Sequence, residues 1–437
     1  MVPCRLYFFN HAPSVFRLFI HSPLMIQYEK FILENGMRVL VHRDTTTHLA
    51  AFNLLYNVGA RDEKEEQTGF AHLFEHLMFG GSKNIPSFDE PLQRAGGENN
   101  AFTSNDITNY YETLPAHNLE TAFWLESDRM LELDFEGRAL EVQRKVVCEE
   151  FKEHYINQPY GDVWHKLRAL AYTAHPYKWP TIGKELSHID NATKDDVKNF
   201  FFKNYRPNNA ILVVAGNVEV AEVKRLAEKY FGSIPSGEKA VKQIPVEPKQ
   251  TEERKSEVRA DVPLDALYKV YHMPARLDKN YYPVDLLSDI LSAGKSSRLY
   301  QKLVKEKKLF SEVSAYITGS LDPGLFVFEG KLVKGVSMKD AETALQEEIN
   351  HVLQNEIDAV ELEKVKNRVE SQTEFAEMEL LHKAMNLAYA ELLGNPELVN
   401  EEKKYYQAVT AADILREAKN VLRNENCSTL YYLSNQN

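Results

Sequence analysis

The chain has few cysteines and no excess of positive charge, and both shortages exclude classes of protein. Its 437 residues include three cysteines, Cys4, Cys148 and Cys427, which are too few and too widely spaced for a disulfide framework or a zinc knuckle. Lysine and arginine number 52 against 64 aspartates and glutamates, a formal net charge of −12. A nucleic-acid-binding surface has no support from this balance, so we expect no nucleic acid among the partners.

Long apolar runs are also lacking. No uncharged apolar stretch approaches the roughly 18 to 20 residues that cross a bilayer, so we expect no membrane span. Within residues 1–24, polar residues and prolines interrupt the apolar stretch, and no A-x-A cleavage site follows it. We therefore expect 1–24 to be an extension that is disordered or not translated, with Met25 as the initiator of a cytoplasmic protein. Export to the periplasm, with this segment as the signal, is the alternative.

The remaining composition is that of a globular protein, and the length exceeds what one hydrophobic core usually organises. Both halves show the same order: a strand, a short helix ended by glycine, further helices, and an apolar strand with a helix. This order predicts an α+β fold of two duplicated domains, each an antiparallel sheet with helices packed on one face. We place the domains at 25–235 and 258–437. The segment 236–257 is rich in Pro, Gly, Lys and Glu without an apolar period, which predicts a linker.

Local signals predict several individual elements. Asn35-Gly36 lies between two strand-like runs and predicts a hairpin. A short helix is expected at about 69–79, with Thr68 as its N-cap and Gly80-Gly81 at its end. Further helices are predicted at 138–156, 297–308 and 358–394.

The sharpest chemical signal is the pentapeptide His72-Leu-Phe-Glu75-His76. At about 100° per residue, the two histidines project about 40° apart on one helical face. Two imidazoles placed in this way can hold one metal ion, and Zn²⁺ favours nitrogen ligands. Glu75 lies close to the same face and can take a proton from water without occupying the metal. The alternative is a core helix with two hydrogen-bonded histidines, but burying these groups without partners would cost several kcal/mol, which favours the metal site.

A third protein ligand is needed, and the helix at 138–156 offers Glu149, Glu150 and Glu153. The helical neighbours of Glu149 are mostly charged, whereas those of Glu150 are partly apolar. This difference favours Glu150 facing inward but does not decide it. Surface charge is the usual role of a glutamate and is the alternative for each of the three.

The paired motifs resemble a known family. HLFEH, followed 74 positions after His76 by Glu150, resembles the pitrilysin/insulinase family of zinc endopeptidases, and above all its half-length branch with mitochondrial processing peptidase. The likeness extends over nearly all of 28–437. It implies one Zn²⁺ per chain, with His72, His76 and Glu150 as ligands, and Glu75 as general base in the hydrolysis of peptides or unfolded segments. A non-catalytic scaffold subunit of the same fold is the alternative.

The resemblance also implies roles for residues outside the metal motif. Asn100, Ala101 and Phe102 match an edge strand that pairs with the substrate backbone, although the residues alone would read as a polar loop. Gln143 falls where many members keep a second carboxylate two turns before the ligand glutamate. An amide there can still hydrogen-bond but carries no charge.

The second half lacks the metal motif. Asp285 and Asp289 match the two histidines and Ser288 matches the base, so no second metal site is expected. We expect this half to be structural, to form a wall of the substrate chamber, or both.

The second half also lacks two groups that active family members carry. The resemblance places Val304 and Ser311 where those members have an arginine and, seven residues later, a tyrosine that stabilise the developing oxyanion. It therefore implies a homologous partner subunit that supplies this pair in a heterodimer. A shifted alignment or a weak enzyme is the alternative.

Overall fold

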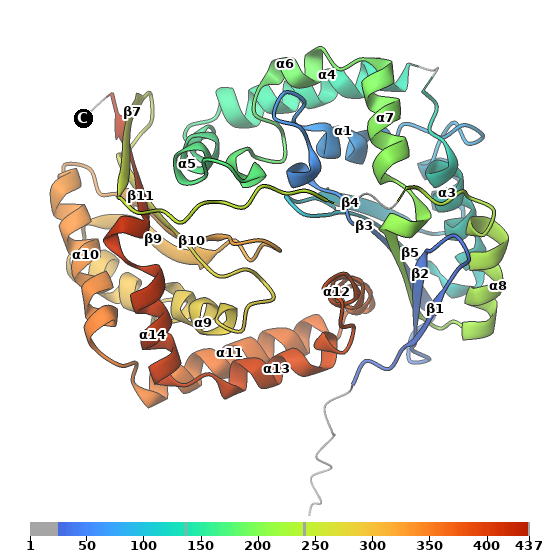
Figure 1. The fold of residues 1–437 in the computed structure, drawn as a ribbon. Helices are drawn as coiled ribbons and strands as arrows, with labels where there is room; N and C mark the ends of the chain where they lie inside the picture. Colours follow the sequence, from blue (N-terminus) through green and yellow to red (C-terminus); the bar gives the residue numbers. More distant parts are fainter. Residues whose placement is uncertain (1–24, 136–137, 239–241, 436–437) are drawn as a thin grey trace, which may run out of the picture.

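The structure, a computed structural model, describes residues 25–435 except 136–137 and 239–241. It has two α+β halves, each built on one sheet (Figure 1). The predicted fold class, two duplicated domains in which helices pack on sheets, is confirmed. The expectation for the extension 1–24 lies outside the described residues.

The first sheet contains six strands. In spatial order they are β1 (Glu29–Ile32), β2 (Arg38–Arg43), β6 (Ala210–Gly216), β3 (Leu49–Tyr56), β5 (Thr108–Pro115) and β4 (Glu98–Thr103). Neighbouring strands are antiparallel except β2 and β6, which are parallel. The predicted hairpin joins β1 to β2. Its Gly36 has φ +87°, a backbone conformation that glycine adopts without strain.

The helices of the first half mostly cover one face of this sheet. They are α1 (Phe70–Leu77), α2 (Asp89–Arg94), α3 (Leu119–Leu131), α4 (Ala139–Phe151), α5 (Val163–Ala171), α6 (Leu186–Asp190), α7 (Lys194–Asn204) and α8 (Val220–Phe231). The helix predicted at 138–156 is continuous in the chain, but its last turn, Lys152–Ile156, is π-helical.

The second sheet contains β7 (Arg254–Ala260), β11 (Cys427–Ser434), β8 (Ala266–His272), β10 (Leu325–Leu332) and β9 (Phe310–Ile317), in spatial order. Here β7 and β11 are the parallel pair, and the other neighbours are antiparallel. The helices are α9 (Tyr281–Ser292), α10 (Met338–Gln354), α11 (Ala359–Ala376), α12 (Leu380–Leu392), α13 (Leu398–Ala408) and α14 (Ala411–Val421). The predicted helix 297–308 is largely π-helical, over Tyr300–Glu306.

Two element predictions were wrong. The predicted linker 236–257 overlaps β7, which starts at Arg254 and pairs with β11. Its sequence, RKSEVRA, has one large apolar residue, so it carries no visible strand pattern. The helix expected over 358–394 is two helices, α11 and α12, which separate after Ala376 and point to different parts of the molecule.

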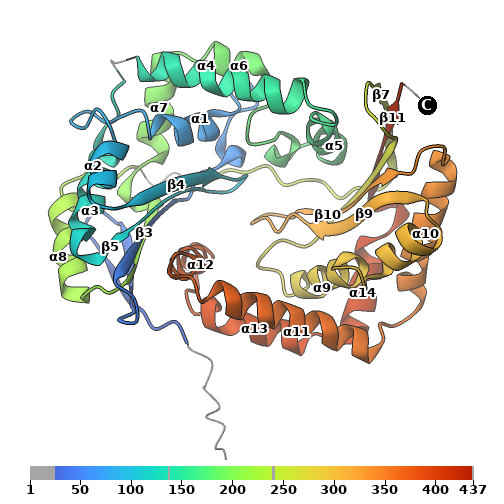
Figure 2. The ribbon, with the colours of Figure 1, turned by 180° about the vertical axis from the view of Figure 1, so that it is seen from behind.

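Each half contributes one helix that packs on the sheet of the other half. Helix α5 packs on β7, β8 and β11 of the second sheet, and α12 packs on β2, β3 and β6 of the first. Two separate apolar clusters form at these contacts, one around Leu167 and Val270 and one around Leu387 and Val213. Figure 2 shows α12 set apart from α11 and α13, beside the first sheet. The two halves are therefore joined through both sheets. Within the described residues, no helix is long and apolar enough to cross a membrane.

Candidate metal centre

Helix α1 is fixed by the apolar side chains on one of its faces. Phe70, Leu73, Phe74 and Leu77 are buried in the core of the first half, at helical spacing. The hydroxyl of Tyr110 on β5 donates to the Phe74 carbonyl oxygen (3.2 Å). The opposite face, with both histidines and the glutamate of HLFEH, is left half-buried. The core packing of α1 thus determines where the candidate ligands point.

The start of α1 differs from the prediction. The N-cap is Gly69, with φ +88°, and not Thr68, whose hydroxyl oxygen accepts from the backbone N–H of Lys184 (2.7 Å). The buried carboxylate of Glu63 accepts from the N–H groups of Gly69 and Ala71 (both 2.8 Å). Glu63 therefore satisfies the first free N–H groups of the helix. Sequence reasoning missed it because it lies six residues upstream of the cap.

Helices α1 and α4 bring three candidate ligands together. Nε2 of His72 lies 3.7 Å from Oε1 of Glu150, and Nε2 of His76 lies 3.4 Å from Oε2 of the same carboxylate. One ligand atom from each of the three residues falls within 4.8 Å of the others. Within the described residues this is the only group of three or more His, Cys, Asp or Glu side chains that converges in this way.

The electrostatics of the three residues suit a divalent cation. Burial lowers the pKa of His72 from its usual value, which favours the neutral imidazole that a metal requires. The hydrogen bond from His76 lowers the pKa of Glu150 from its usual value, which favours its carboxylate. Two neutral imidazoles and one carboxylate are the donor set of a zinc site with an open position. The residues present therefore fit Zn²⁺.

The other two candidate glutamates of the α4 region do not converge with the two histidines. Glu149 is exposed and pairs with Lys152 (2.7 Å), and Glu153 is exposed as well.

Gln143 lies two turns before Glu150 on α4, and its side chain approaches Gly80 near the end of α1. It is thus placed between the two helices that carry the candidate ligands.

Strand β4 forms an edge of the first sheet and packs against α1. It pairs only with β5, in the register Asn100 to Tyr111 and Ala101 to Tyr110. The N–H of Ala101 donates to the side-chain oxygen of Asn100 (2.8 Å), so this N–H faces the free edge and not β5. Phe102 is 40% exposed. The segment matched to a substrate-binding strand is therefore a strand with a free edge.

The two positions where the arginine and tyrosine are missing belong to the second half. Val304 packs against the core of that half, and the Ser311 hydroxyl donates to the Lys331 carbonyl oxygen (3.1 Å). At the position matched to the first histidine, Asp285 accepts from the hydroxyl of Tyr406 (2.5 Å). These side chains are occupied by local contacts.

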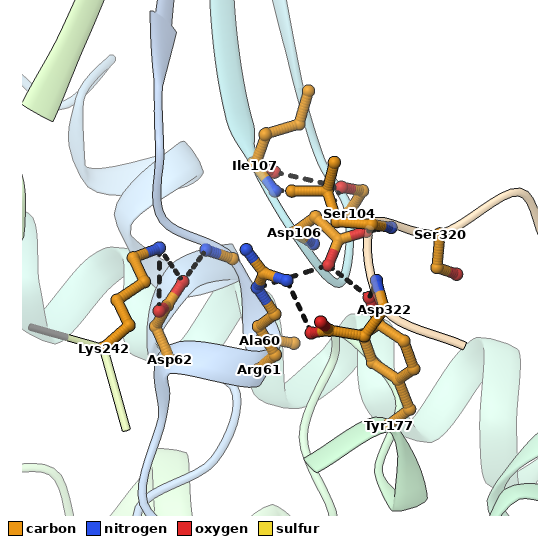
Figure 3. Close-up of polar contacts among 12 residues, drawn as sticks. Ala60, Arg61, Asp62, Ser104, Asp106, Ile107, Tyr177, Lys242, Ser320 and Asp322 are labelled. Carbon is orange, nitrogen blue, oxygen red and sulfur yellow. Dashed lines mark hydrogen bonds and ion pairs between the residues drawn. The ribbon is translucent and has the colours of Figure 1, made fainter. Parts of the chain in front are cut away.

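A polar cluster near the end of β4 joins the two halves, and sequence analysis did not predict it (Figure 3). Arg61 pairs with Asp106 in the β4–β5 turn (3.3 Å) and with Asp322 of the second half (2.6 Å). The Tyr177 hydroxyl donates to Asp106 (2.5 Å), and Lys242 pairs with Asp62 (2.8 Å). The members come from five separate segments, so no local pattern could have identified them.

Comparison with known proteins supports the assignment of the fold. The family model described as "Insulinase (Peptidase family M16)" matches residues 38–185, and "Peptidase M16 inactive domain" matches 191–369. The zinc protease PqqE of Helicobacter pylori is 34% identical over 350 residues, 78% of each chain. The mitochondrial-processing peptidase subunit beta of Saccharomyces cerevisiae is 28% identical over 48% of this chain and 45% of its own.

Solved structures agree with these sequence matches. A protease from Helicobacter pylori superposes with a TM-score of 0.89 at 29% identity, covering 93% of this chain and all of that one. Pitrilysin superposes with a TM-score of 0.76 at 20% identity, covering 93% of this chain and 45% of that one. The chain belongs to the insulinase (peptidase M16) family, in its half-length bacterial branch.

Proposed function

We propose that this chain is a zinc-dependent metalloendopeptidase that hydrolyses peptides or unfolded segments. The observation that carries the proposal is the convergence of His72, His76 and Glu150, with Glu75 on the same helix as the two histidines. The names of relatives, such as the zinc protease PqqE, support a peptidase of this kind.

The chain's own residues have distinct roles in this scheme. The two histidines and Glu150 would hold a Zn²⁺ ion, which would act as the Lewis acid for the attacking water and the scissile carbonyl. Glu75 accepts the proton of the attacking water at its carboxylate and passes it to the leaving amine. The free edge of β4 holds the substrate backbone in an extended conformation through main-chain hydrogen bonds. Affinity from these bonds does not depend on substrate side chains.

Glu75→Gln tests the role of the base. The amide cannot accept the proton, so we expect turnover of an unfolded protein substrate to fall by roughly 10² to 10⁴. Because Glu75 is not a ligand, zinc content measured by mass spectrometry should stay near one per chain. The exposed Glu153→Gln is the control and should change neither value. Full hydrolysis by the Glu75→Gln protein would rule out this role.

We further propose that the active form pairs with a homologous subunit. Val304 has no hydrogen-bond donor, and Ser311 is several ångströms shorter than a tyrosine, so neither replaces the arginine and tyrosine of active members. The relationship to a subunit of mitochondrial-processing peptidase supports pairing of half-length chains. The test is an assay of the zinc-loaded chain with and without its co-expressed homologue. Full activity of the single chain, unchanged by the partner, would contradict the proposal.

Two alternatives, a scaffold role and a periplasmic location, can be tested by simple measurements. A scaffold subunit of the same fold is the first alternative. The model described as an inactive domain matches only residues 191–369, which contain none of the candidate metal ligands. A zinc content near zero after zinc-replete expression would establish the scaffold over the enzyme.

For location we propose the cytoplasm, with the periplasm as the alternative because one structural neighbour is the periplasmic protease PqqL of Escherichia coli. Amino-terminal sequencing of the native protein distinguishes the two.

A further inference from the structure

We propose that the cavity beside the end of β4 is a subsite for a substrate carboxylate, and that Arg168 recognises it. The proposal rests on the proposed peptidase function, because it assumes that an extended peptide lies along β4. It adds a specificity-determining residue in α5, away from the metal ligands.

The cavity has a volume of about 540 Å³ and lies between the two halves. The end of β4, the β4–β5 turn and α5 form its walls on one side. The loop between β9 and β10 and helix α12 form the other side. Its apolar lining includes Leu55, Phe102, Ile107 and Met385. Phe102 belongs to both β4 and the cavity, so a peptide bound along β4 passes the entrance.

Arg168 is a cation without an anionic partner in this lining. Its guanidinium carbon lies 5.3 Å from the centre of the Trp164 ring, and Nη1 donates to the Tyr177 carbonyl oxygen (3.2 Å). Its Nε is buried and has no hydrogen-bond partner. Among the described residues, no carboxylate forms an ion pair with it. Burial lowers the pKa of Arg168, and the charge of Asp106 offsets this effect only in part.

The acidic group in the same lining is already engaged. Asp106 pairs with Arg61, accepts from the Tyr177 hydroxyl, and accepts from the backbone N–H of Leu321 (3.0 Å) (Figure 3). Its charge is therefore compensated by these three partners. Arg168 is left as the charge that a ligand can match.

A carboxylate is the ligand that this arrangement fits. The planar guanidinium binds carboxylates through paired N–H groups, and the apolar walls accommodate an aliphatic stem or a peptide end. Strand residues advance about 3.3 Å each, so Ser104 in the cavity wall lies roughly 10 Å along the chain from Ala101. The recognised group is thus an acidic side chain or a terminal carboxylate about three residues from the one opposite Ala101.

The test measures binding without turnover, using the zinc-loaded Glu75→Gln protein. Fluorescence anisotropy gives the Kd of amidated peptides with one glutamate at successive positions, of the matching all-glutamine peptide, and of that peptide with a free C-terminus. A charge-assisted hydrogen bond predicts that a carboxylate at the right place tightens binding roughly ten- to hundred-fold. Glutamate peptides and the free C-terminus distinguish the two sources. No preference for any carboxylate overturns the proposal.

Variants assign the preference to Arg168. Arg168→Met should abolish it, because the guanidinium is lost while the aliphatic stem is kept. Arg206→Met is the matched control, since Arg206 also lies over an aromatic ring, Phe202, and donates to a backbone carbonyl, but outside this cavity. A preference that survives Arg168→Met, or that Arg206→Met removes equally, overturns the assignment.

A second variant covers the case in which Arg168→Met does not fold. Asn386 is exposed on α12 and lines the same cavity, and Asn386→Asp adds a negative charge with almost no change in shape. It should weaken the carboxylate preference at least several-fold, and an unchanged preference counts against the subsite.

Assays of the wild-type chain distinguish failure of the subsite proposal from failure of the proposed peptidase function. Carboxylate-selective binding without hydrolysis, measured with the co-expressed homologous subunit present, overturns only the enzyme. Hydrolysis without selectivity overturns only the subsite.

Discussion

Two adjacent glutamates on α4 have different environments although the helix winds only about 100° between them. Glu150 faces α1, and its carboxylate oxygens lie 3.4 and 3.7 Å from the two histidine Nε2 atoms. Glu149 is exposed and pairs with Lys152. The geometry thus favours Glu150 as the ligand, where helical neighbours in the sequence left the choice open.

Glu150→Gln should therefore release zinc. Loss of a supporting partner outside the ligand set already costs 10- to 100-fold in metal affinity, so loss of a ligand should cost more than roughly 100-fold. Competition with a chromophoric chelator measures the affinity. Glu149→Gln is the neighbouring control and should leave it unchanged. Equal zinc affinity in the two variants would contradict the ligand assignment.

A second group of charges lies in the core of the first half. Glu112 on β5 and Glu126 on α3 are fully buried next to each other, and Arg129 pairs with Glu126. Burial and the neighbouring Glu126 raise the pKa of Glu112 well above its usual value. One arginine cannot compensate two carboxylates, so the folded chain favours the protonated form of Glu112.

This raised pKa makes stability depend on pH. A carboxyl whose pKa is higher in the folded state contributes its full stability below its unfolded pKa of about 4.3 and loses it as the pH rises towards the folded value. Glu112→Gln imitates the protonated form, so its stability relative to the wild type should increase between pH 5 and pH 8, by a few kcal/mol at most. Urea unfolding at several pH values measures this, with the exposed Glu228→Gln as control. A constant difference across that range would refute the protonated state.

At the scale of elements, the backbone N–H groups of β4 alternate between the free edge of the sheet and the neighbouring strand β5. The Ala101 N–H faces the edge, and because strand groups alternate, the Asn100 N–H faces β5. Proline has no N–H and is tolerated on edge strands only where the ladder does not need one. Ala101→Pro should therefore keep the fold and zinc but weaken peptide binding about ten-fold or more. Asn100→Pro should lower the unfolding temperature. Equal peptide affinity of Ala101→Pro and wild type would contradict binding along this edge.

The elements also show what the sequence could and could not predict. The hairpin at Asn35-Gly36 and helix α1 follow from local turn chemistry and apolar spacing, and both are present. Strand β7 was missed because its side chains alternate between exposed and half-buried positions, and a single large apolar residue, Val258, is too little to mark a strand pattern. The cap from Glu63 depends on a chain reversal that no local pattern encodes.

At the scale of the whole molecule, the halves hold each other in two ways. Helices α5 and α12 each pack on the sheet of the opposite half and bury apolar side chains there. The polar cluster around Arg61 adds ion pairs to Asp106 in the first half and Asp322 in the second. Exchanged helices and dispersed charges are properties of the tertiary fold, so neither is visible in a sequence read along the chain. Both act close to the cavity at the end of β4.

Arg61→Met tests whether the polar cluster ties the halves together. Side chains of Arg61 and Asp106 are only 9% and 8% exposed, so removing the cation leaves a buried carboxylate without its partner. Such a loss typically costs about 3 to 5 kcal/mol, less here because Asp322 is 34% exposed and partly screened. Trp179, whose indole N–H donates to the Ala60 carbonyl oxygen (2.9 Å), lies beside the cluster and its fluorescence can report the unfolding midpoint.

The control is Arg43→Met, which removes an ion pair with Glu219 in which both side chains are at least half exposed. Exposed pairs contribute about 0 to 1 kcal/mol, so this variant should unfold close to the wild-type midpoint. Arg61→Met should unfold at clearly lower urea, and X-ray scattering below that midpoint should show an increased radius of gyration as the halves separate. If Arg61→Met and Arg43→Met unfold at the same urea concentration, the cluster does not join the halves. The exchanged helices alone must then hold the halves together.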